Sequence, residues 1–416
     1  MQELCEALAS NAQRASRALA KATTAQKNAW LLASASALEQ HLDAIGAANA
    51  RDVDAARLSE LGAANIDRLT LTPARIRAAA DGLRQVAALP DPIGEVREDA
   101  VRPNGLRVQK VGVPLGVIFF LYESRPNVTV DAAGLCVKSG NAVILRGGKE
   151  ATHSNELLHA ILRAELSKAG LPTDAVQRVP TLDRAAVGCL LKMSDRIDLV
   201  IPRGGESLIR RVAAEATMPV LKHFQGNCHV YVDRHADLAM AARIIANGKC
   251  QRPGVCNATE SVLVHSAIAR EFLPELGAQL TAAGVEIRGC ERTVALIPEA
   301  VPATDADFGA EFLDLILSVK VVTSMPEALE HIHRYGSKHT DAIVTGDPAT
   351  AREFAAKVDS AAVVVNASTR FNDGFEIGLG AEIGISTDKF HARGPCGLRE
   401  LTSYKYILTG TGQIRA

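Results

Sequence analysis

The stretch PLGVIFFLYESRPNVTVDAAGLCVKSGNAVILRGGKEATHSN, Pro114–Asn155, decides the fold. It opens with the apolar run PLGVIFFLY, which is typical of a buried strand. A helix that ends with GLCVKSG follows, and a second apolar run, NAVILRGG, then leads into the helix that begins at Ala151. This order of strand, helix, strand and helix predicts a parallel βαβ unit.

The same alternation continues on the C-terminal side of this unit. The expected strands are DAVQRVP, IDLVIPRGG and PVLKHF before residue 251, and SVLVH, VEIRGC, LILSVKVV, DAIVTG and AAVVVNA after residue 256. Helical segments such as SAIAREFLPELGAQLTAAG lie between them. We therefore predict an α/β protein with two doubly wound units, each built on a mainly parallel sheet.

The two ends of the chain depart from this alternation. Apolar residues recur at helical spacing from residue 1 to about residue 88, and the breaker LPDPIG ends this helical region. The pair Asn104-Gly105 lies between two alternating runs and predicts a β-hairpin. The tail from about Ser368 is rich in glycine and ends in the strand-like run LTSYKYILTG.

The composition is that of a globular protein. The chain has 416 residues, of which 47% are hydrophobic and 22% charged, and its formal net charge is -1. This balance provides no general field for nucleic acid or a membrane, and the length favours two or three domains. No apolar run reaches the roughly 18 residues of a membrane span, and the N-terminus lacks the pattern of a secretory signal. The eight cysteines are scattered without a CxxC pair, which favours reduced thiols in the cytoplasm over a metal site.

One cysteine, Cys256, lies on the loop QRPGVCNATE, Gln251–Glu260, between a predicted helix and the strand SVLVH. This loop marks the seam between the two α/β units, and ligand crevices are common at such boundaries and at the carboxyl ends of strands. A lone cysteine is usually a small buried hydrophobic residue. The kinked Gln-Arg-Pro-Gly approach instead favours a nucleophile, because a core cysteine needs no such loop.

Two turns are candidate phosphate sites. Neither the dinucleotide fingerprint GxGxxG nor the phosphate loop GxxxxGK[ST] occurs in the chain. The turns LRGGKEA (Leu145–Ala151) and PRGGES (Pro202–Ser207) each place paired glycines beside a cation. Glycines allow backbone N–H groups to approach a phosphate, and the N-terminus of the following helix favours an anion. A plain connection between a strand and a helix is the alternative for both turns.

The block Pro114–Asn155 resembles the aldehyde dehydrogenase superfamily and, more narrowly, the gamma-glutamyl phosphate reductases of proline biosynthesis. Further blocks match in the same order: IDLVIPRGG, VLKHFQGNCHVYVD, QRPGVCNATESVLVH, AAVVVNASTRFNDG and GAEIGISTDKFHARGPCGLRELTSYKY. The matching blocks run from about residue 100 to the C-terminus, and the N-terminal helices are compatible with the family.

The resemblance implies an aldehyde dehydrogenase-like fold of three parts. They are an NADPH-binding domain (residues 1–94 and 114–249), a catalytic domain (250–367) and a β-flap for oligomerisation (95–113 and 398–416). The implied protein is a cytoplasmic homo-oligomer without a nucleic-acid or membrane partner.

The resemblance also implies a reaction. NADPH would reduce L-glutamate 5-phosphate to L-glutamate 5-semialdehyde with release of phosphate. Docking on a glutamate 5-kinase, which makes the labile acyl phosphate, stays open. Two alternatives also stay open: a reductase of the same superfamily for another acyl phosphate or an acyl-CoA, and a non-catalytic scaffold.

In this comparison Cys256 matches the family's nucleophile, whose thiolate would form a thioester and release phosphate. Hydrolytic members have an Asn at the position of Ser124, so the oxyanion would here rely more on backbone N–H groups; Asn127 lies nearby but aligns less well. Hydrolytic members also have a water-activating Glu where this chain has His223. The loss of that carboxylate fits an enzyme that keeps its thioester from water, and a packing role is the alternative for His223.

The cofactor turn also departs from NAD-using relatives, which have a Lys and then a Glu near the adenosine ribose. This chain has Arg146 and Lys149 at the matching positions. Two cations would attract a 2′-phosphate, which favours NADPH, with solvated surface charge as the alternative. Glu311 matches the glutamate that contacts the nicotinamide ribose. The expected cofactor-binding residues are Arg146, Gly147, Gly148, Lys149, Arg203, Gly204, Gly205 and Glu311.

The implied substrate has a phosphate, an α-carboxylate and an α-ammonium group. Arginine suits oxyanions because its guanidinium binds them with two parallel hydrogen bonds. The candidate anion-binding residues are Arg125, Arg370, His391 and Arg393. Glu123 or Asp373 would hold the ammonium group, and Asn127 is a further candidate contact. Each of these residues has a structural role as its alternative.

Overall fold

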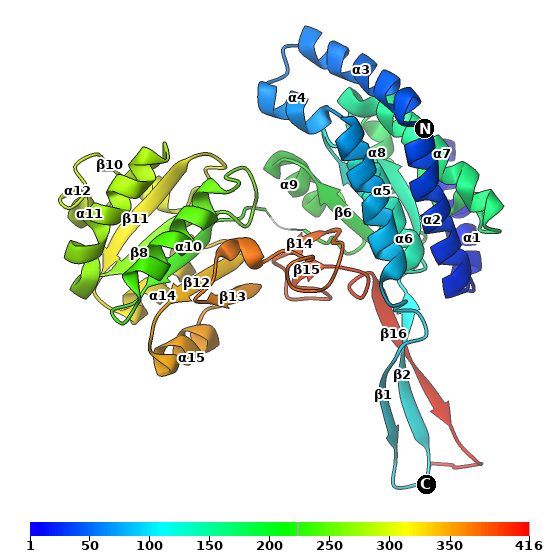
Figure 1. Cartoon of the computed structure of the whole chain (residues 1–416). Coiled ribbons are helices and arrows are strands. Elements are labelled where there is room, and N and C mark those ends of the chain that lie inside the picture. Colours follow the sequence, from blue (N-terminus) through cyan, green and yellow to red (C-terminus); the bar gives the residue numbers. More distant parts are fainter. Residues whose placement is uncertain (223, 416) are drawn as a thin grey trace. The chain divides into compact units, whose positions relative to one another are not determined.

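The computed structural model describes residues 1–222 and 224–415, and its helices and strands are labelled in Figure 1. By its internal contacts the chain divides into two compact units. The first unit contains Met1–Lys222, Leu379–Gly384 and Cys396–Ala416, and the second contains His223–Gly378 and Ile385–Pro395. Each unit contains a parallel sheet with helices, which confirms the α/β class predicted from the sequence.

The first unit is built on a four-stranded sheet in the order β5-β4-β3-β6. Its strands are β3 (Val117–Tyr122), β4 (Ala142–Arg146), β5 (Val176–Arg178) and β6 (Leu199–Arg203). Neighbouring strands pair in parallel throughout. Every residue of the central strand β3 is buried, which is why this strand appears in the sequence as an unbroken apolar run.

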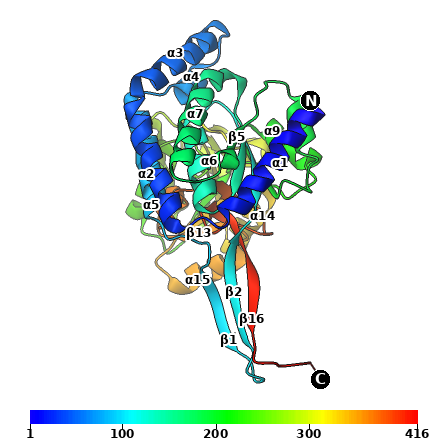
Figure 2. The same cartoon turned by 90° about the vertical axis from the view of Figure 1, so that its right-hand side faces the viewer.

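The helices of the first unit are α1 (Gln2–Leu19), α2 (Thr24–Gln40), α3 (Leu42–Leu58), α4 (Ala63–Leu69), α5 (Pro73–Ala88), α6 (Asn127–Lys138), α7 (Thr152–Lys168), α8 (Ala185–Leu190) and α9 (Glu206–Glu215). Short 3₁₀ turns occur at η1 (Lys149–Ala151) and η2 (Thr173–Ala175). A reciprocal capping box of Thr23 and Gln26 begins α2. Helix α2 packs against α5 and α7, and in Figure 2 α6 and α7 lie between α2 and α1.

The flap is an antiparallel three-stranded sheet of β1 (Val96–Val101), β2 (Arg107–Pro114) and β16 (Thr402–Thr409), in the order β1-β2-β16 (Figure 1). Asn104 and Gly105 form the turn between β1 and β2. Gly105 has a positive φ of 84°, and Oδ1 of Asn104 accepts a hydrogen bond from the backbone N–H of Leu106 at 3.2 Å. The predicted hairpin is therefore present, and the C-terminal strand pairs with it.

The second unit is built on a seven-stranded sheet in the order β10-β9-β11-β8-β7-β12-β13. Its strands are β7 (Cys228–Val232), β8 (Thr259–His265), β9 (Glu286–Gly289), β10 (Val301–Pro302), β11 (Ile316–Val322), β12 (Thr340–Val344) and β13 (Ala362–Val365). All neighbouring strands are parallel. The central strands β7 and β8 are buried along their whole length, so they fix the segments that come directly before them.

The helices of the second unit are α10 (Leu238–Cys250), α11 (Ser266–Ala282), α12 (Glu291–Val294), α13 (Asp305–Phe308), α14 (Met325–Tyr335) and α15 (Pro348–Lys357), with a 3₁₀ turn at η3 (Thr369–Phe371). Near the C-terminus, β14 (Gly384–Ser386) pairs with β15 (Gly394–Cys396). Among the described residues, no helix combines the length and the hydrophobicity that crossing a membrane requires.

The division between the units differs from the domain boundary expected at residues 249–250. Strand β7 pairs with β8 and β12, so β7 and the helix α10 that follows it belong to the second unit. The strand–helix alternation runs through residue 222 without a break, so the sequence pattern contains no mark of the change of sheet. Of the strand expected at PVLKHF, the described residues form one isolated parallel bridge, between Val220 and Val200.

Candidate active site

Cys256 lies on the segment that connects α10 to β8. Asp237 caps the start of α10 by accepting a hydrogen bond from the backbone N–H of Met240. A tight turn, in which the N–H of Ala258 donates to the carbonyl of Val255 at 3.0 Å, returns the chain into β8. Cys256 is only partly buried, whereas Asn257, directly after it, is buried. The turn therefore places the cysteine just before the start of the central strand β8.

A second cysteine lies beneath the backbone of Cys256. Cys228, at the start of β7, donates a hydrogen bond through its Sγ to the carbonyl oxygen of Cys256 at 3.2 Å. Burial raises the pKa of the Cys228 thiol well above its ordinary value, and the nearby Asp341 and Cys256 raise it further. Cys228 is therefore held as a neutral thiol. Of this pair, only Cys256 has the exposure that a nucleophile needs.

The chain approaches Cys256 closely at Gly226. A Cβ atom added at Gly226 would lie 1.9 Å from the carbonyl oxygen of Cys256 and 2.6 Å from its Cα. No side chain fits in that space, because real Cβ contacts are much longer. Glycine is thus required here by the backbone of the cysteine segment itself.

Cations surround the Cys256 segment. Nε of Arg370, in η3, donates to Oε1 of Gln251 at 2.8 Å. Burial lowers the pKa of Arg370 and the Arg252 cation lowers it further, whereas Asp373 and the Cys256 side chain act in the opposite direction. Arg370 therefore lies near both Arg252 and the Cys256 side chain, where a guanidinium can interact with a bound anion. Of the predicted anion-binding residues, Arg370 is the one shown to interact with the Cys256 segment.

Asn257 anchors η3 to the same segment. Its Nδ2 donates to the carbonyls of Asn372, at 3.0 Å, and Arg370, at 3.4 Å. In return, Oγ1 of Thr369 donates to the carbonyl of Asn257 at 2.8 Å. These bonds hold η3, and with it Arg370, against the segment that contains Cys256. The bonded residues are more than a hundred positions apart in the sequence.

A buried ion pair that sequence reasoning missed joins the two ends of the segment that contains Cys256. Nζ of Lys249 is 2.6 Å from Oε2 of Glu260, and both side chains are fully buried. The other oxygen, Oε1, accepts a hydrogen bond from the backbone N–H of Leu313 at 3.3 Å. Burial raises the pKa of Glu260 to about 7 against the opposing effect of Lys249, and Glu311 raises it further. Glu260 therefore connects two segments: the one that contains the predicted nucleophile Cys256, and the one that contains the predicted cofactor contact Glu311.

In the first unit, the segment Glu123–Asn127 forms hydrogen bonds with both glycine turns, LRGGKEA and PRGGES. Ser124 has a positive φ of 43°, and its N–H and Oγ both donate to Oε1 of Glu150, at 2.6 and 2.9 Å. Oε2 of Glu123 accepts a hydrogen bond from the N–H of Gly205 at 2.8 Å. The carboxylate of Glu123 thus takes the anion position at the start of α9, where a phosphate was expected.

Other predicted residues in these turns have internal partners as well. A Cβ at Gly204 would lie 2.5 Å from Oε2 of Glu123, and one at Gly384 would lie 3.0 Å from Nη1 of Arg203. Nδ2 of Asn127 donates to Oδ2 of Asp131 at 3.0 Å. Burial raises the pKa of Asp131 to about 6, while the bond to Asn127 and the Arg203 cation lower it. The structure thus brings Glu123 together with Arg203, Gly204 and Gly205.

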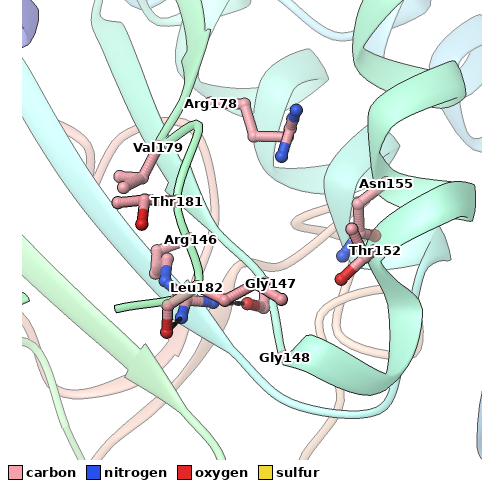
Figure 3. Close-up of a pocket in the computed structure, with 9 residues that line it drawn as sticks. All are labelled: Arg146, Gly147, Gly148, Thr152, Asn155, Arg178, Val179, Thr181 and Leu182. Atoms are coloured by element: carbon pink, nitrogen blue, oxygen red, sulfur yellow. Dashed lines mark hydrogen bonds between the residues drawn. The ribbon is translucent and has the colours of Figure 1, made fainter. Parts of the chain in front are cut away.

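The other glycine turn opens onto a small pocket at the ends of β4 and β5 (Figure 3). The residues that line it are Arg146, Gly147, Gly148, Thr152, Asn155, Arg178, Val179, Thr181 and Leu182. Arg146 donates to the carbonyls of Gly147 and, at 3.0 Å, Leu182, while its buried Nε has no hydrogen-bond partner among the described residues. Lys149, expected beside Arg146, is exposed and is not among the lining residues.

Arg178 is a pocket residue that the sequence analysis did not name. It is the last residue of β5, the strand next to β4, and donates to Glu156 at 3.0 Å. Burial lowers the pKa of Arg146, and the cations Arg178 and Arg184 lower it further, so both of these guanidinium groups lie near that of Arg146. Its position at the end of the expected strand DAVQRVP is the feature that could have revealed it.

The remaining predicted residues are placed as follows. Nη2 of Arg393 donates to the backbone carbonyl of Asp359 at 3.0 Å and to its carboxylate at 2.9 Å, and Lys389 binds the same carboxylate at 2.8 Å. Hydrogen bonds from Lys389 and then Arg393 lower the pKa of Asp359 to about 2. His391 has a positive φ of 70°, and the carbonyl of Arg125 accepts the N–H of Val128 at 3.0 Å. His223 lies outside the described residues.

Comparisons with known proteins show the family of the chain. A model of the aldehyde dehydrogenase family matches residues 1–294. The gamma-glutamyl phosphate reductase of Rhodopirellula baltica is 61% identical over 411 residues, which are 99% of this chain and 95% of that protein. The crystal structure of gamma-glutamyl phosphate reductase from Thermotoga maritima has a TM-score of 0.97 at 45% identity, covering 99% of this chain and 100% of that one.

A more distant structure, an engineered glycolyl-CoA reductase with bound NADP+, shares the fold at a TM-score of 0.70 and 15% identity, covering 97% of this chain and 96% of that one. The chain belongs to the aldehyde dehydrogenase family, whose members are oxidoreductases that use nicotinamide cofactors. Within this family it groups with the gamma-glutamyl phosphate reductases, enzymes of proline biosynthesis.

Proposed function

We propose that this enzyme uses NADPH to reduce L-glutamate 5-phosphate to L-glutamate 5-semialdehyde, with release of phosphate, through a thioester on Cys256. The main support is the combination of one partly exposed thiol with Arg370 and Arg252 beside it. The substrate class follows the names of the relatives at 61% and 45% identity.

In this proposal the thiolate of Cys256 attacks the acyl carbon of the substrate. A C–S bond forms, the bond between that carbon and the phosphate oxygen breaks, and phosphate leaves with the bonding electron pair. When bound, the cofactor supplies the hydride that reduces the thioester. The C–S bond then breaks, the aldehyde is released, and the sulfur leaves as the thiolate.

Arg370 and Arg252 have an electrostatic task in this sequence. During the attack they oppose the charge that accumulates on the departing phosphate. The bond from Arg370 Nε to Gln251 orients the guanidinium, so that its terminal nitrogens are the ones available to an oxyanion.

The pocket of Arg146 fits the 2′-phosphate of NADPH. Three features support the fit: the buried Nε of Arg146 has no partner among the described residues, Arg178 lines the same pocket, and Arg184 lies near Arg146. A dianionic phosphate would relieve the mutual repulsion of these guanidinium groups, whereas the ribose hydroxyl of NADH would not. The fold relative with bound NADP+ is consistent with this choice.

Roles for the other residues remain part of the proposal. Glu311 would hold the nicotinamide ribose, and the absence of a carboxylate at His223 would protect the thioester from water. Ser124 would leave oxyanion stabilisation to backbone N–H groups. The first unit would bind NADPH, the second would supply Cys256, and the flap, whose β16 exposes Tyr406 and Leu408, would join copies of the chain into an oligomer.

The test is the reverse reaction, in which NADP+ is reduced with L-glutamate 5-semialdehyde and inorganic phosphate as substrates. We expect turnover that requires phosphate and is absent in Cys256→Ala. Turnover without phosphate would identify a hydrolytic dehydrogenase. Turnover with coenzyme A in place of phosphate would identify an acyl-CoA reductase.

A further inference from the structure

The ion pair of Lys249 and Glu260 lies at the base of the segment that contains Cys256. Lys249 is in the last turn of α10, and Glu260 is in β8, so the pair joins the two ends of the intervening segment. The distance between Nζ and Oε2 is 2.6 Å, and neither side chain is accessible to solvent (0% exposed for each).

The surroundings of the pair are tightly packed. A Cβ at Gly248 would lie only 2.2 Å from Oγ1 of Thr259, and this oxygen is 3.0 Å from Oγ1 of Thr369 in η3. The end of α10, the start of β8 and η3 are therefore in direct contact. Water cannot replace either partner of the ion pair at such a place, so each charge depends on the other.

The carboxylate also reaches a third segment. Its Oε1 accepts the backbone N–H of Leu313, a residue with the unusual positive φ of 55°. A leucine rarely adopts this conformation without support from its surroundings. Two residues earlier lies Glu311, whose charge is near enough to affect Glu260. One carboxylate thus links the ends of the Cys256 segment to the Glu311–Leu313 segment.

A buried ion pair is a poor means of stabilising a fold, because apolar residues of the same volume do as well or better. We propose that Glu260, oriented by Lys249, is a positioning residue that fixes the Glu311–Leu313 segment relative to Cys256. The inference rests on the proposed function, in which Cys256 is the nucleophile and Glu311 contacts the nicotinamide ribose. Its consequence is that the Leu313 hydrogen bond contributes to cofactor binding.

Two double variants separate this hydrogen bond from the charge. Lys249→Met/Glu260→Gln removes both charges but keeps an oxygen that can accept the N–H of Leu313. Lys249→Met/Glu260→Leu removes the acceptor as well. We expect the Leu variant to bind NADP+ about tenfold more weakly than the wild type, as for a lost hydrogen bond to a buried acceptor. The Gln variant should recover most of this loss.

Binding is measured without turnover, as the NADP+ concentration that protects Cys256 from alkylation by iodoacetamide. In the reverse reaction, the KM for NADP+ should rise with the dissociation constant. The KM for phosphate should change by less than about twofold, since the proposed phosphate contacts Arg370 and Arg252 lie outside the displaced Glu311–Leu313 segment. Glu260→Asp, which keeps the charge but is one methylene shorter, is a further variant if the Leu substitution prevents folding; it should weaken NADP+ binding in the same direction.

Lys27 and Asp91 provide a matched control. They form another buried pair with a distance of 2.6 Å, located in the N-terminal helical region of the first unit. Lys27→Met/Asp91→Asn should lower the unfolding temperature without changing the protection by NADP+. If the Leu variant of Glu260 behaves like this control, Glu260 is only structural and the proposal is wrong.

The experiments distinguish a failure of the proposed function from a failure of the role inferred for Glu260. If the wild type shows no phosphate-dependent reduction of NADP+, or if Cys256→Ala retains it, the assignment of the nucleophile fails, and the inference fails with it. If the wild type is active and the Leu and Asp variants bind NADP+ as tightly as it does, only the inference is overturned.

Discussion

Nε of Arg370 donates a hydrogen bond to Oε1 of Gln251 over 2.8 Å, although the two residues are 119 positions apart. Gln251 begins the segment that contains Cys256, so the bond ties a cation to the predicted nucleophile. Because the bond uses Nε, it fixes the plane of the guanidinium and leaves the end formed by the two terminal nitrogens for a second partner. This geometry distinguishes Arg370 from Arg393, whose Nη2 already binds Asp359 at 2.9 Å.

Arg370→Lys should therefore impair the binding of phosphate. A lysine cannot both keep the Gln251 bond and bind an oxyanion in two places, so we expect the KM for phosphate in the reverse reaction to rise about tenfold. Arg393→Lys is the matched control, and we expect it to change this KM by less than about twofold, since its guanidinium is engaged by an exposed carboxylate. If the KM for phosphate rose more in Arg393→Lys than in Arg370→Lys, Arg393 and not Arg370 would be the anion-binding residue.

Arg146 and Arg178 should decide the choice of cofactor. Replacing either residue with alanine removes a cation from the pocket in Figure 3. We expect the KM for NADPH to rise about tenfold for each variant, as for a lost charge-assisted hydrogen bond, with no comparable change for NADH. Arg163→Ala is a suitable control, because Arg163 is an exposed residue of α7 paired with Asp174 at 3.3 Å. An equal rise of KM for NADPH and for NADH would show that the 2′-phosphate does not bind in this pocket.

The parts of this structure that could be predicted from the sequence are those fixed by local patterns. The unbroken apolar run at β3 has the composition of a strand buried on both faces, and Gly105 of the Asn104-Gly105 pair has the positive φ that glycine adopts easily in a tight turn. The Cys256 segment was also predictable, since its Pro and Gly residues separate a helix from a strand.

The parts that could not be predicted depend on pairings between distant segments. The division between the two units could not be predicted, because the pairing of β7 with β12 leaves no trace in the sequence near residue 222. Glu123 was expected to meet a ligand, yet its carboxylate caps the Gly205 turn 82 residues later. The ion pair of Lys249 and Glu260 could not be predicted, because charged residues are rarely buried. Only the fold shows that the two charges are paired.

His331 should make the second unit sensitive to acid. It is buried on α14 with its ring against Phe308 and Tyr335, at centroid distances of 5.2 and 4.6 Å. Burial lowers the pKa of His331 to about 3, and the neighbours His229, Lys320 and Arg334 act in the same direction. The unfolded chain, where a histidine has a pKa of about 6.5, therefore binds a proton that the folded chain excludes.

The stability contributed by neutral His331 is complete above about pH 6.5 and is lost as the pH falls toward 3, by at most about 1.4 kcal/mol per pH unit. We expect stability to depend less steeply on pH in His331→Gln than in the wild type. The measurement is the urea midpoint of unfolding at a series of pH values between 7 and 4. His333→Gln, on the exposed side of the same helix, should leave the curve unchanged. Identical slopes for His331→Gln and the wild type would contradict the prediction.

Gly226 should be the glycine that the site tolerates least. An added Cβ would meet the carbonyl oxygen of Cys256 at 1.9 Å, and this atom belongs to the backbone, which cannot rotate away. Gly226→Ala should therefore lower the free energy of unfolding by about 1–3 kcal/mol, the usual cost of overpacking. Because the displaced atoms belong to the predicted nucleophile, we also expect kcat to fall by about a hundredfold. Gly46→Ala in α3 is the control: nothing lies within 4 Å of its added Cβ, so the variant should keep full activity and gain up to about 1 kcal/mol of stability. If Gly226→Ala were as active as Gly46→Ala, the close approach of the two backbones would have no part in placing the cysteine.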